Sequence, residues 1–458
     1  MKKTWLGILL LLLLVLAGCD TGSKSIVFLT NRTDLRNTLL KEAVEQFELK
    51  YQDSDWKVRV ETITDYENVV STRLSGNNYG DVLLIPQTVD SRNLDRYFKP
   101  FGTVSEMKNQ GWNGINTKAF NNQVYGLPIG LQSAGILINN DVFDKAGVDP
   151  ATLTTPELFI QGMEQIQTYA EANITDWKAT FHTQTATGWG LAQWAGGVIS
   201  ASGDPDYPNL ILPWDQNAFW NQANDEAGTI GKMYELLFNL IASDLVESSP
   251  TIDQWEQSKI WFAQGKIAAI SVGSWAIQQF EEVAESVEAG RSADIGYMPY
   301  PFAKENGDMY ASIAADYTIG VAKNSKNKDI AEAFAKWLVE DFNYASKTGN
   351  IPPKDGSAYP EKIAAFEASG VILVEETPSP LDYEGALAHA ERNAASGPTD
   401  EKRIALWDTL WITDFVANAF DVRDNKSSVT VKQLLQDIQA KWNNGINAVI
   451  EEFGTKPN

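Results

Sequence analysis

Residues 26–63 read IVFLTNRTDLRNTLLKEAVEQFELKYQDSDWKVRVETI and contain a strand–helix–strand pattern. Residues 26–30 are an apolar run of strand length. A helix is expected over residues 35–51, and Asp34 stands where its N-terminal cap is expected. Apolar side chains recur within it at helical spacing, at Leu39, Leu40, Ala43, Val44, Phe47 and Tyr51. Residues 56–63 alternate apolar with charged or polar side chains at period two, which predicts a second strand.

The same pattern continues beyond the second strand. A short amphipathic helix is expected at residues 67–74 and a buried strand at residues 81–86. Strands that alternate with helices predict an α/β fold with right-handed crossovers and a mostly parallel sheet covered on both faces. Further along the chain, spacing and composition predict buried strands at residues 267–272 and 371–374 and helices at residues 331–338, 403–420 and 430–449.

Polar or aromatic residues follow each of the first three expected strands. In open α/β sheets, ligands bind at the carboxyl ends of the strands. The loops in question are Thr30-Asn31-Arg32, Thr64-Asp65-Tyr66 and Pro86-Gln87. The candidate binding residues of this region are therefore Asn31, Arg32, Asp34, Tyr66 and Gln87, although each also fits a turn or a helix cap.

The N-terminus has the parts of a secretory signal. Lys2 and Lys3 precede an apolar run and then Leu16-Ala17-Gly18-Cys19, which resembles the bacterial lipobox. We expect a signal peptide at residues 1–18, a diacylated Cys19 that anchors the chain to the outer side of the cell membrane, and a linker at residues 19–25. Cys19 is the only cysteine, although an ordinary signal peptide containing a cysteine would look the same.

Composition limits the classes of function. A hydrophobic content of 43% with 11% aromatic residues is typical of a packed globular protein, and 458 residues are too many for one domain. The net charge of −23 argues against a nucleic-acid partner, because Lys and Arg supply most of the affinity for phosphate.

Catalytic motifs are missing from the sequence. It contains two histidines, His182 and His389, and no His-Glu-x-x-His, Gly-x-Ser-x-Gly, Walker A or complete Gly-x-Gly-x-x-Gly motif. We therefore expect no metal, no cofactor and no enzymatic activity. A glycosidase that uses two carboxylates stays open, because Asp and Glu are abundant.

Several segments carry a resemblance to a known family. The segments are VYGLP at 124–128, GILINNDVFDKAGV at 135–148, WFAQGKIAAI at 261–270 with Gly273-Ser274-Trp275 after it, IGYMP at 295–299 and IGVAK at 319–323. In this order they resemble blocks of bacterial extracellular solute-binding proteins of the sugar-binding family 1, the receptors of ABC importers.

The resemblance implies an α/β periplasmic-binding-protein fold of type II, with two lobes joined by about three crossover segments. The N-terminal lobe would comprise residues 26–131 and 299–345, and the C-terminal lobe residues 132–298 and 346–458. A monomer would close on a neutral mono- or oligosaccharide and deliver it to the membrane permease. Relatives also carry polyols and glycerophosphodiesters, and a lipid-anchored adhesin or structural lipoprotein is a further alternative.

The resemblance also suggests binding residues. A sugar offers an apolar face for an aromatic ring and hydroxyls for carboxylates and amides. Trp275 matches the position where family members place a stacking tryptophan, and Asp316 and Tyr317 precede an expected strand near the site. Trp189, Trp194 and Trp407 are further aromatic candidates. Any of these four tryptophans could instead belong to the core.

Overall fold

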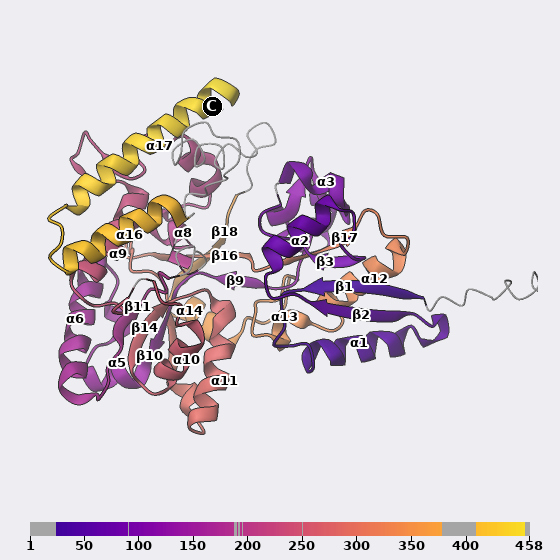
Figure 1. Cartoon of the computed structure of the whole chain (residues 1–458), viewed down its shortest axis with the longest axis horizontal. Helices are drawn as coiled ribbons and strands as arrows, with labels where there is room; N and C mark the ends of the chain where they lie inside the picture. Colours follow the sequence, from indigo (N-terminus) through magenta and orange to yellow (C-terminus); the bar gives the residue numbers. More distant parts are fainter. Residues whose placement is uncertain are drawn as a thin grey trace, which may run out of the picture.

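The computed structural model describes residues 24–89, 91–186, 190, 193–194, 196–249, 251–377 and 409–453. Figure 1 shows two lobes, with β9 (Leu131–Ser133) and β16 (Met309–Ala315) running between them. Each lobe has its own sheet and its own large hydrophobic core. Within the described ranges, no helix combines the length and apolar character needed to cross a membrane.

The smaller lobe is built on a sheet of strand order β2-β1-β3-β17-β4, with β8 paired to β17. Its strands are β1 (Ser25–Thr30), β2 (Lys57–Thr62), β3 (Val82–Leu84), β4 (Phe98–Lys99), β8 (Leu127–Pro128) and β17 (Thr318–Ala322). The first three strands and α2 (Tyr66–Ser75) confirm the expected elements. β1 runs parallel to β2 in a register that pairs Ser25 with Lys57 and Thr30 with Thr62.

The expectation of a mostly parallel sheet is wrong. β17 runs antiparallel to β3, with Ile319 opposite Leu84 and Val321 opposite Val82. It is also antiparallel to β4 and β8. The reason is the path of the chain: β17 follows β16, which arrives from the other lobe, so β17 begins at the edge where β3 ends.

The first helix, α1 (Leu39–Lys50), begins four residues after the start of the range expected for it, residues 35–51. Asp34 does not cap it, because its carboxylate is held by Arg32 at a distance of 2.7 Å between Nη2 and Oδ2. The helix packs through Phe47, whose ring lies 5.0 Å from Phe334 and 5.4 Å from Trp337 on α12 (Lys328–Glu340). α12 confirms the helix expected at residues 331–338. This lobe also contains α3 (Leu94–Tyr97), α4 (Val104–Asn109), α13 (Tyr344–Lys347), β5 (Gly102–Thr103), β6 (Ala119–Phe120) and β7 (Gln123–Val124).

The larger lobe is built on a sheet of order β11-β14-β10-β15. Its strands are β10 (Ile136–Asn139), β11 (Ala179–His182), β14 (Ile267–Ser271) and β15 (Ile295–Met298). β11 is parallel to β14, whereas β10 is antiparallel to β14 and β15. β14 is fully buried and confirms the strand expected at residues 267–272.

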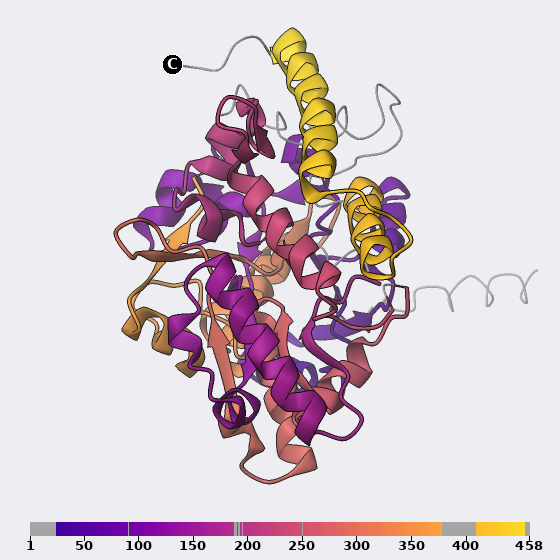
Figure 2. The ribbon, with the colours of Figure 1, turned by 90° about the vertical axis from the view of Figure 1, so that its left-hand side faces the viewer.

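Helices cover the side of the larger lobe that faces away from the smaller one (Figures 1 and 2). They include α6 (Pro156–Asn173), α9 (Thr229–Ala242), α16 (Thr409–Arg423) and α17 (Val431–Phe453). The last two confirm C-terminal helices; residues 403–408 of the first one lie outside the described ranges. Other elements here are α5 (Asn140–Ala146), α8 (Val198–Ser202), α10 (Trp255–Ala263), α11 (Ile277–Val287), α14 (Glu361–Ala368), β12 (Trp220–Asn221) and β13 (Glu226–Ala227).

A three-stranded sheet of order β18-β16-β9 lies where the lobes meet. β16 pairs with β9 through Ala315 and Leu131, and with β18 (Val371–Glu375) in parallel. The strand expected at residues 371–374 is therefore present, but it is not buried along its length: Val371 is buried, whereas Ile372 is 37% exposed. An edge strand is covered less than the central strand of a sheet, which explains the difference.

Candidate ligand-binding site

The loops that follow β1, β2 and β3 meet at one edge of the smaller lobe. The hydroxyl of Tyr66 donates to the carbonyl of Leu29 at 3.1 Å and to that of Leu84 at 2.6 Å. It thereby ties the start of α2 to the ends of β1 and β3. Tyr66 itself is only 3% exposed and belongs to the hydrophobic core, so in this structure it stabilises the edge through its hydrogen bonds.

The start of β17 joins the same edge. Gln87 donates from Nε2 to the carbonyl of Asp316 at 2.9 Å, and the Tyr317 hydroxyl donates to Oε1 of Glu67 at 3.0 Å. The structure thus brings Gln87, Asp316 and Tyr317 together with Arg32, whose charge acts on Asp316. We call Arg32, Glu67, Gln87, Asp316 and Tyr317 the small-lobe cluster.

Asp316 has a carboxyl group whose pKa is shifted within this cluster. Burial raises the pKa of its carboxyl to about 6, although the positive charge of Arg32 acts in the opposite direction. No described residue donates a hydrogen bond to this carboxylate. Nearby, Oδ1 of Asn31 is buried and has no partner in the described part of the chain. Both groups are acceptors that a hydroxyl-bearing ligand could satisfy.

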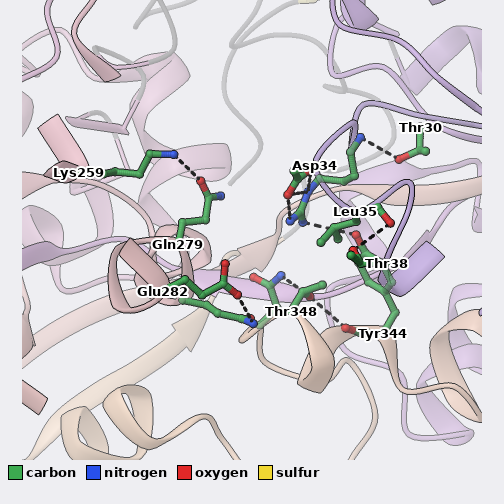
Figure 3. Close-up of polar contacts among 12 residues, drawn as sticks. Thr30, Asp34, Leu35, Thr38, Lys259, Gln279, Glu282, Tyr344 and Thr348 are labelled. Atoms are coloured by element: carbon green, nitrogen blue, oxygen red, sulfur yellow. Dashed lines mark hydrogen bonds and ion pairs between the residues drawn. The ribbon is translucent and has the colours of Figure 1, made fainter. Parts of the chain in front are cut away.

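Arg32 carries a lasting positive charge at this edge. Burial acts to lower the pKa of its guanidinium, but the hydrogen bonds to Asp34 and the charges around it raise the pKa overall. Its Nη1 also lies 3.4 Å from the hydroxyl of Tyr344. Figure 3 shows Asp34, from the loop after β1, on the opposite side of the view from Lys259 and Gln279 of the larger lobe.

Trp275 stands at the corresponding edge of the larger lobe, in a short 3₁₀ turn between β14 and α11. Its indole Nε1 donates to Oε1 of Gln193 at 3.2 Å, and the backbone amide of Gly273 donates to the same oxygen at 2.9 Å. The ring of Trp255 lies 5.6 Å away at an interplanar angle of 44°. Both tryptophans are partly exposed, so the two rings form an aromatic pair that a ligand can reach.

A buried lysine lies beside this aromatic pair. Nζ of Lys259 is 5.2 Å from the ring centroid of Trp255, a distance suited to a cation–π contact. The same nitrogen pairs with Glu256 at 2.9 Å and donates to Oε1 of Gln279 at 3.4 Å (Figure 3). The charge of Lys259 is therefore already compensated by protein groups.

The segment around β9 connects the two sets of residues. The carbonyl of Gly130 accepts a hydrogen bond from the amide of Asp316 at 3.1 Å. Three residues later, the amide of Ser133 donates to the Ser274 hydroxyl at 2.9 Å. Between them, Oε1 of Gln132 is buried without a partner among the described residues. This arrangement places a further unsatisfied acceptor between Asp316 and Trp275.

Glycine is required at position 273 by the same close approach. A Cβ atom there would lie 2.1 Å from Oε1 of Gln132 and 2.7 Å from the Trp275 ring. The Gly-x-Trp motif is thus explained by crowding between the strand end and β9.

Other expected site residues are placed differently or are not described. Trp194 is 4% exposed and lies in the core, where Nε1 donates to the carbonyl of Met233 at 3.1 Å. Its ring meets Tyr300 edge to face at 5.3 Å. Trp189, Trp407 and Cys19 lie outside the described residues.

The sequence reasoning missed Glu67, Gln193 and Trp255. Glu67 follows the already suspected Tyr66, so its proximity could have been noticed. Gln193 and Trp255 belong to no recognised motif. They come next to Trp275 only through folding, so residue spacing along the sequence does not reveal them. Among the residues that the structure describes, there is no group of three or more His, Cys, Asp or Glu that could hold a metal ion.

Comparison with known proteins gives consistent matches. A manno-oligosaccharide-specific solute-binding protein of Bifidobacterium animalis subsp. lactis, solved with mannotriose, has a TM-score of 0.79, 27% identity and coverage of 94% of this chain and 96% of that one. A binding protein of an ABC transporter from the same organism, solved with mannobiose, has a TM-score of 0.80, 28% identity and coverage of 93% and 95%.

Sequence relatives agree with these structures. The melibiose/raffinose/stachyose-binding protein of Bacillus subtilis is 22% identical over 358 residues, which cover 75% of this chain and 78% of the relative. The family model described as bacterial extracellular solute-binding protein matches residues 42–371, well over half of the chain. The two-lobed α/β fold and this match lead to one conclusion: the chain belongs to the bacterial extracellular solute-binding proteins.

Proposed function

We propose that this protein binds an oligosaccharide between its two lobes and delivers it to the permease of an ABC importer. The named ligands of its relatives support this proposal: mannobiose and mannotriose in two similar structures, and raffinose-type sugars in a sequence relative. The observation that carries it is the connection through β9, which joins an aromatic pair on one lobe to a partly exposed carboxylate on the other that no described residue bonds to.

The chemistry of the two edges suits a sugar. The apolar face of a pyranose would stack on Trp275 or Trp255, and its hydroxyls would donate to Asp316, Asn31 and Gln132. A ligand that contacts both lobes binds the closed form more tightly than the open form, and this differential affinity shifts the population toward closure. The charges of Arg32 and Lys259 are already paired, so the site does not call for an anionic ligand.

The setting of the protein follows from the same proposal. Cys19 would be lipidated after removal of residues 1–18, and the lobes would stand outside the cell membrane on the linker of residues 19–25. Lobes of residues 26–131 with 299–345 and 132–298 with 346–458 stay a prediction. We place the point where the chain returns to the N-terminal lobe nearer Asp316 than residue 299, because Tyr300 and Phe302 pack in the core of the larger lobe.

Of the alternatives, no observation favours an adhesin. Enzymatic activity is not expected of this chain, since its family comprises binding proteins of transporters. Trp275, Asp316, Tyr317, Asn31, Arg32 and Gln87 are proposed as ligand contacts, with Tyr66 in support.

Thermal melting of purified residues 20–458 tests the proposal. The panel would contain mono-, di- and oligosaccharides, including manno- and galacto-oligosaccharides, together with polyols and glycerophosphates. A ligand at 100 times its Kd stabilises the native state by about 2.7 kcal/mol, which a melting curve resolves. Selective stabilisation by one class of oligosaccharide supports the proposal. A flat response from folded, ligand-free protein, or a shift with glycerophosphates alone, would overturn it.

A further inference from the structure

A buried histidine and a buried acid lie next to each other in the larger lobe. His182 ends β11 and is 2% exposed, and Glu247, which follows α9, is 5% exposed. Nδ1 of His182 lies 3.4 Å from Oε2 of Glu247. The Glu247 carboxylate also accepts hydrogen bonds from the amide and the hydroxyl of Thr183, at 2.8 and 2.6 Å. The proposed binding function does not use this pair directly.

The hydrogen-bond partners of His182 indicate its protonation state. Nε2 lies 2.9 Å from Oε1 of Gln184, whose own amide nitrogen donates to Oδ1 of Asp253 at 2.8 Å. A reversed Gln184 amide would point its oxygen at the Asp253 carboxylate, so Oε1 is the acceptor and Nε2 of His182 carries a proton. Nδ1 makes no hydrogen bond to a described residue, but the negative charge of Glu247, 3.4 Å away, favours a proton there. Both ring nitrogens therefore carry hydrogen, and His182 is an imidazolium.

The charges around His182 agree with this state. Burial acts to lower the pKa of the imidazole, but Glu247, Gln184 and Asp253 raise it overall above its ordinary value of 6.5. Burial likewise acts to raise the pKa of Glu247, yet His182 and Thr183 lower it to about 2. From the neighbouring strand β14, Ile270 stands opposite His182 and brings no charge.

The network reaches the candidate site through Asp253. Oδ1 of Asp253 accepts the amide hydrogen of Trp255 at 3.0 Å, and Trp255 is the first residue of α10. The ring of Trp255 then meets that of Trp275. A second contact runs through Gly190, where a Cβ atom would lie 2.2 Å from the carbonyl of Gln184. Gly190 stands three residues before Gln193, the acceptor of the Trp275 indole.

We propose that His182 is a positioning residue for the binding site: as an imidazolium it holds Gln184, which through Asp253 sets the start of α10 and the orientation of Trp255 against Trp275. The inference rests on the proposed sugar-binding function only for its effect on affinity. Loss of a His182 proton at alkaline pH removes either the donor to Gln184 or the positive charge beside Glu247. The aromatic pair is then less well held, and the ligand binds more weakly.

Two histidines make the test direct. In His389→Gln protein, His182 gives the single histidine signal, and its NMR titration shows whether the ring is charged at pH 7. We expect a doubly protonated ring at pH 7 that loses its proton at a higher pH. The indole N–H signal of Trp275, assigned with Trp275→Phe, should shift over the same pH range. A neutral His182 at pH 7, or an indole signal that ignores its titration, overturns the proposal without any ligand being needed.

Affinity supplies the second measurement. The Kd for the oligosaccharide identified by melting should rise several-fold across the His182 titration in His389→Gln protein. At pH 7, Asp253→Ala should raise Kd several-fold, whereas Asp253→Asn, which removes the charge but keeps an oxygen acceptor for Trp255, should raise it less. Equal Kd for both variants, or a Kd independent of the His182 charge, contradicts the positioning role. A lack of any binding sugar would count against the proposed function instead, because the NMR result stands apart from it.

Discussion

Asp316 illustrates how a single side chain can be prepared for a ligand at a cost to stability. Its side chain is partly buried and lacks a hydrogen bond from any described residue, and desolvation raises the pKa of its carboxyl to about 6 from the ordinary 3.8. Arg32 offsets part of the burial, but the net effect still disfavours the charged form. Such a carboxylate gains more from a ligand hydroxyl than an already satisfied one does, because its acceptors are unpaired.

The pH dependence of stability should reveal this cost. Between pH 4 and pH 6 the folded protein holds the Asp316 proton more tightly than the unfolded chain does, so its free energy of unfolding falls as the pH rises. Asp316→Asn removes this term. Chemical unfolding at several pH values should find the variant more stable than the parent above pH 6, with the difference shrinking toward pH 4. A difference that does not change with pH would contradict the assignment.

Trp275 is the residue whose loss should weaken binding most directly. Trp275→Ala should reduce the affinity for the oligosaccharide by about 1–3 kcal/mol, because it removes one ring of the aromatic pair. Isothermal titration calorimetry measures the change. Trp261→Ala is the matched control: Trp261 is also partly exposed, and its ring lies 5.3 Å from Nζ of Lys178. Unchanged affinity in folded Trp275→Ala protein would remove Trp275 from the site.

At the scale of elements, the smaller lobe depends on the packing of α1 against α12. Phe47 meets both Phe334 and Trp337 edge to face, and Phe28 of β1 meets Phe334 at 5.5 Å. One aromatic cluster therefore holds α1 and α12 against β1, the strand that ends at the candidate edge. The apolar spacing predicted which residues of α1 face inward, since Leu40, Ala43 and Phe47 are its buried residues.

Truncation within this cluster should be costly. Phe47→Ala should lower the free energy of unfolding by about 3–5 kcal/mol, the usual range for a buried aromatic residue that leaves a cavity. Leu49→Ala, on the same helix but 66% exposed, should change it by less than about 0.5 kcal/mol. Denaturant unfolding of both variants provides the comparison. Similar losses for the two would show that α1 packs differently.

At the scale of the whole molecule, β9 and β16 connect the lobes and hold both edges of the site. Asp316 lies directly after β16, and the backbone amide of Ser133 in β9 donates a hydrogen bond to the hydroxyl of Ser274, which stands beside Trp275. A ligand that contacts both edges favours the arrangement in which the two lobes are closed around it. The connection thus couples binding to the relative placement of the lobes.

Small-angle X-ray scattering should detect this coupling. With saturating oligosaccharide, the radius of gyration of residues 20–458 should decrease, because closure makes the molecule more compact. At a concentration that saturates the parent protein, Trp275→Ala should show a smaller decrease, because less of it is bound. A saturable heat of binding with no change in the radius of gyration would count against hinge closure.

Residue patterns along the chain were enough to predict the local elements. The apolar run before Thr30, the period-two pattern before Ile63 and the helical spacing around Phe47 each depend on neighbours a few residues apart, so they could be recognised without a fold. The positions of Asp316 and Trp275 also followed from sequence, through an expected strand edge and a Gly-x-Trp resemblance.

The way in which those elements combine depends on contacts that form only in the folded protein. It reversed the direction of β17, took Asp34 from α1 to Arg32, buried Trp194 and brought Gln193 to Trp275. These outcomes join residues that are distant in the chain or that compete for the same partner. Their free energies depend on burial and on which charges and hydrogen-bonding groups meet after the lobes form, and the spacing of residues along a sequence does not contain that information.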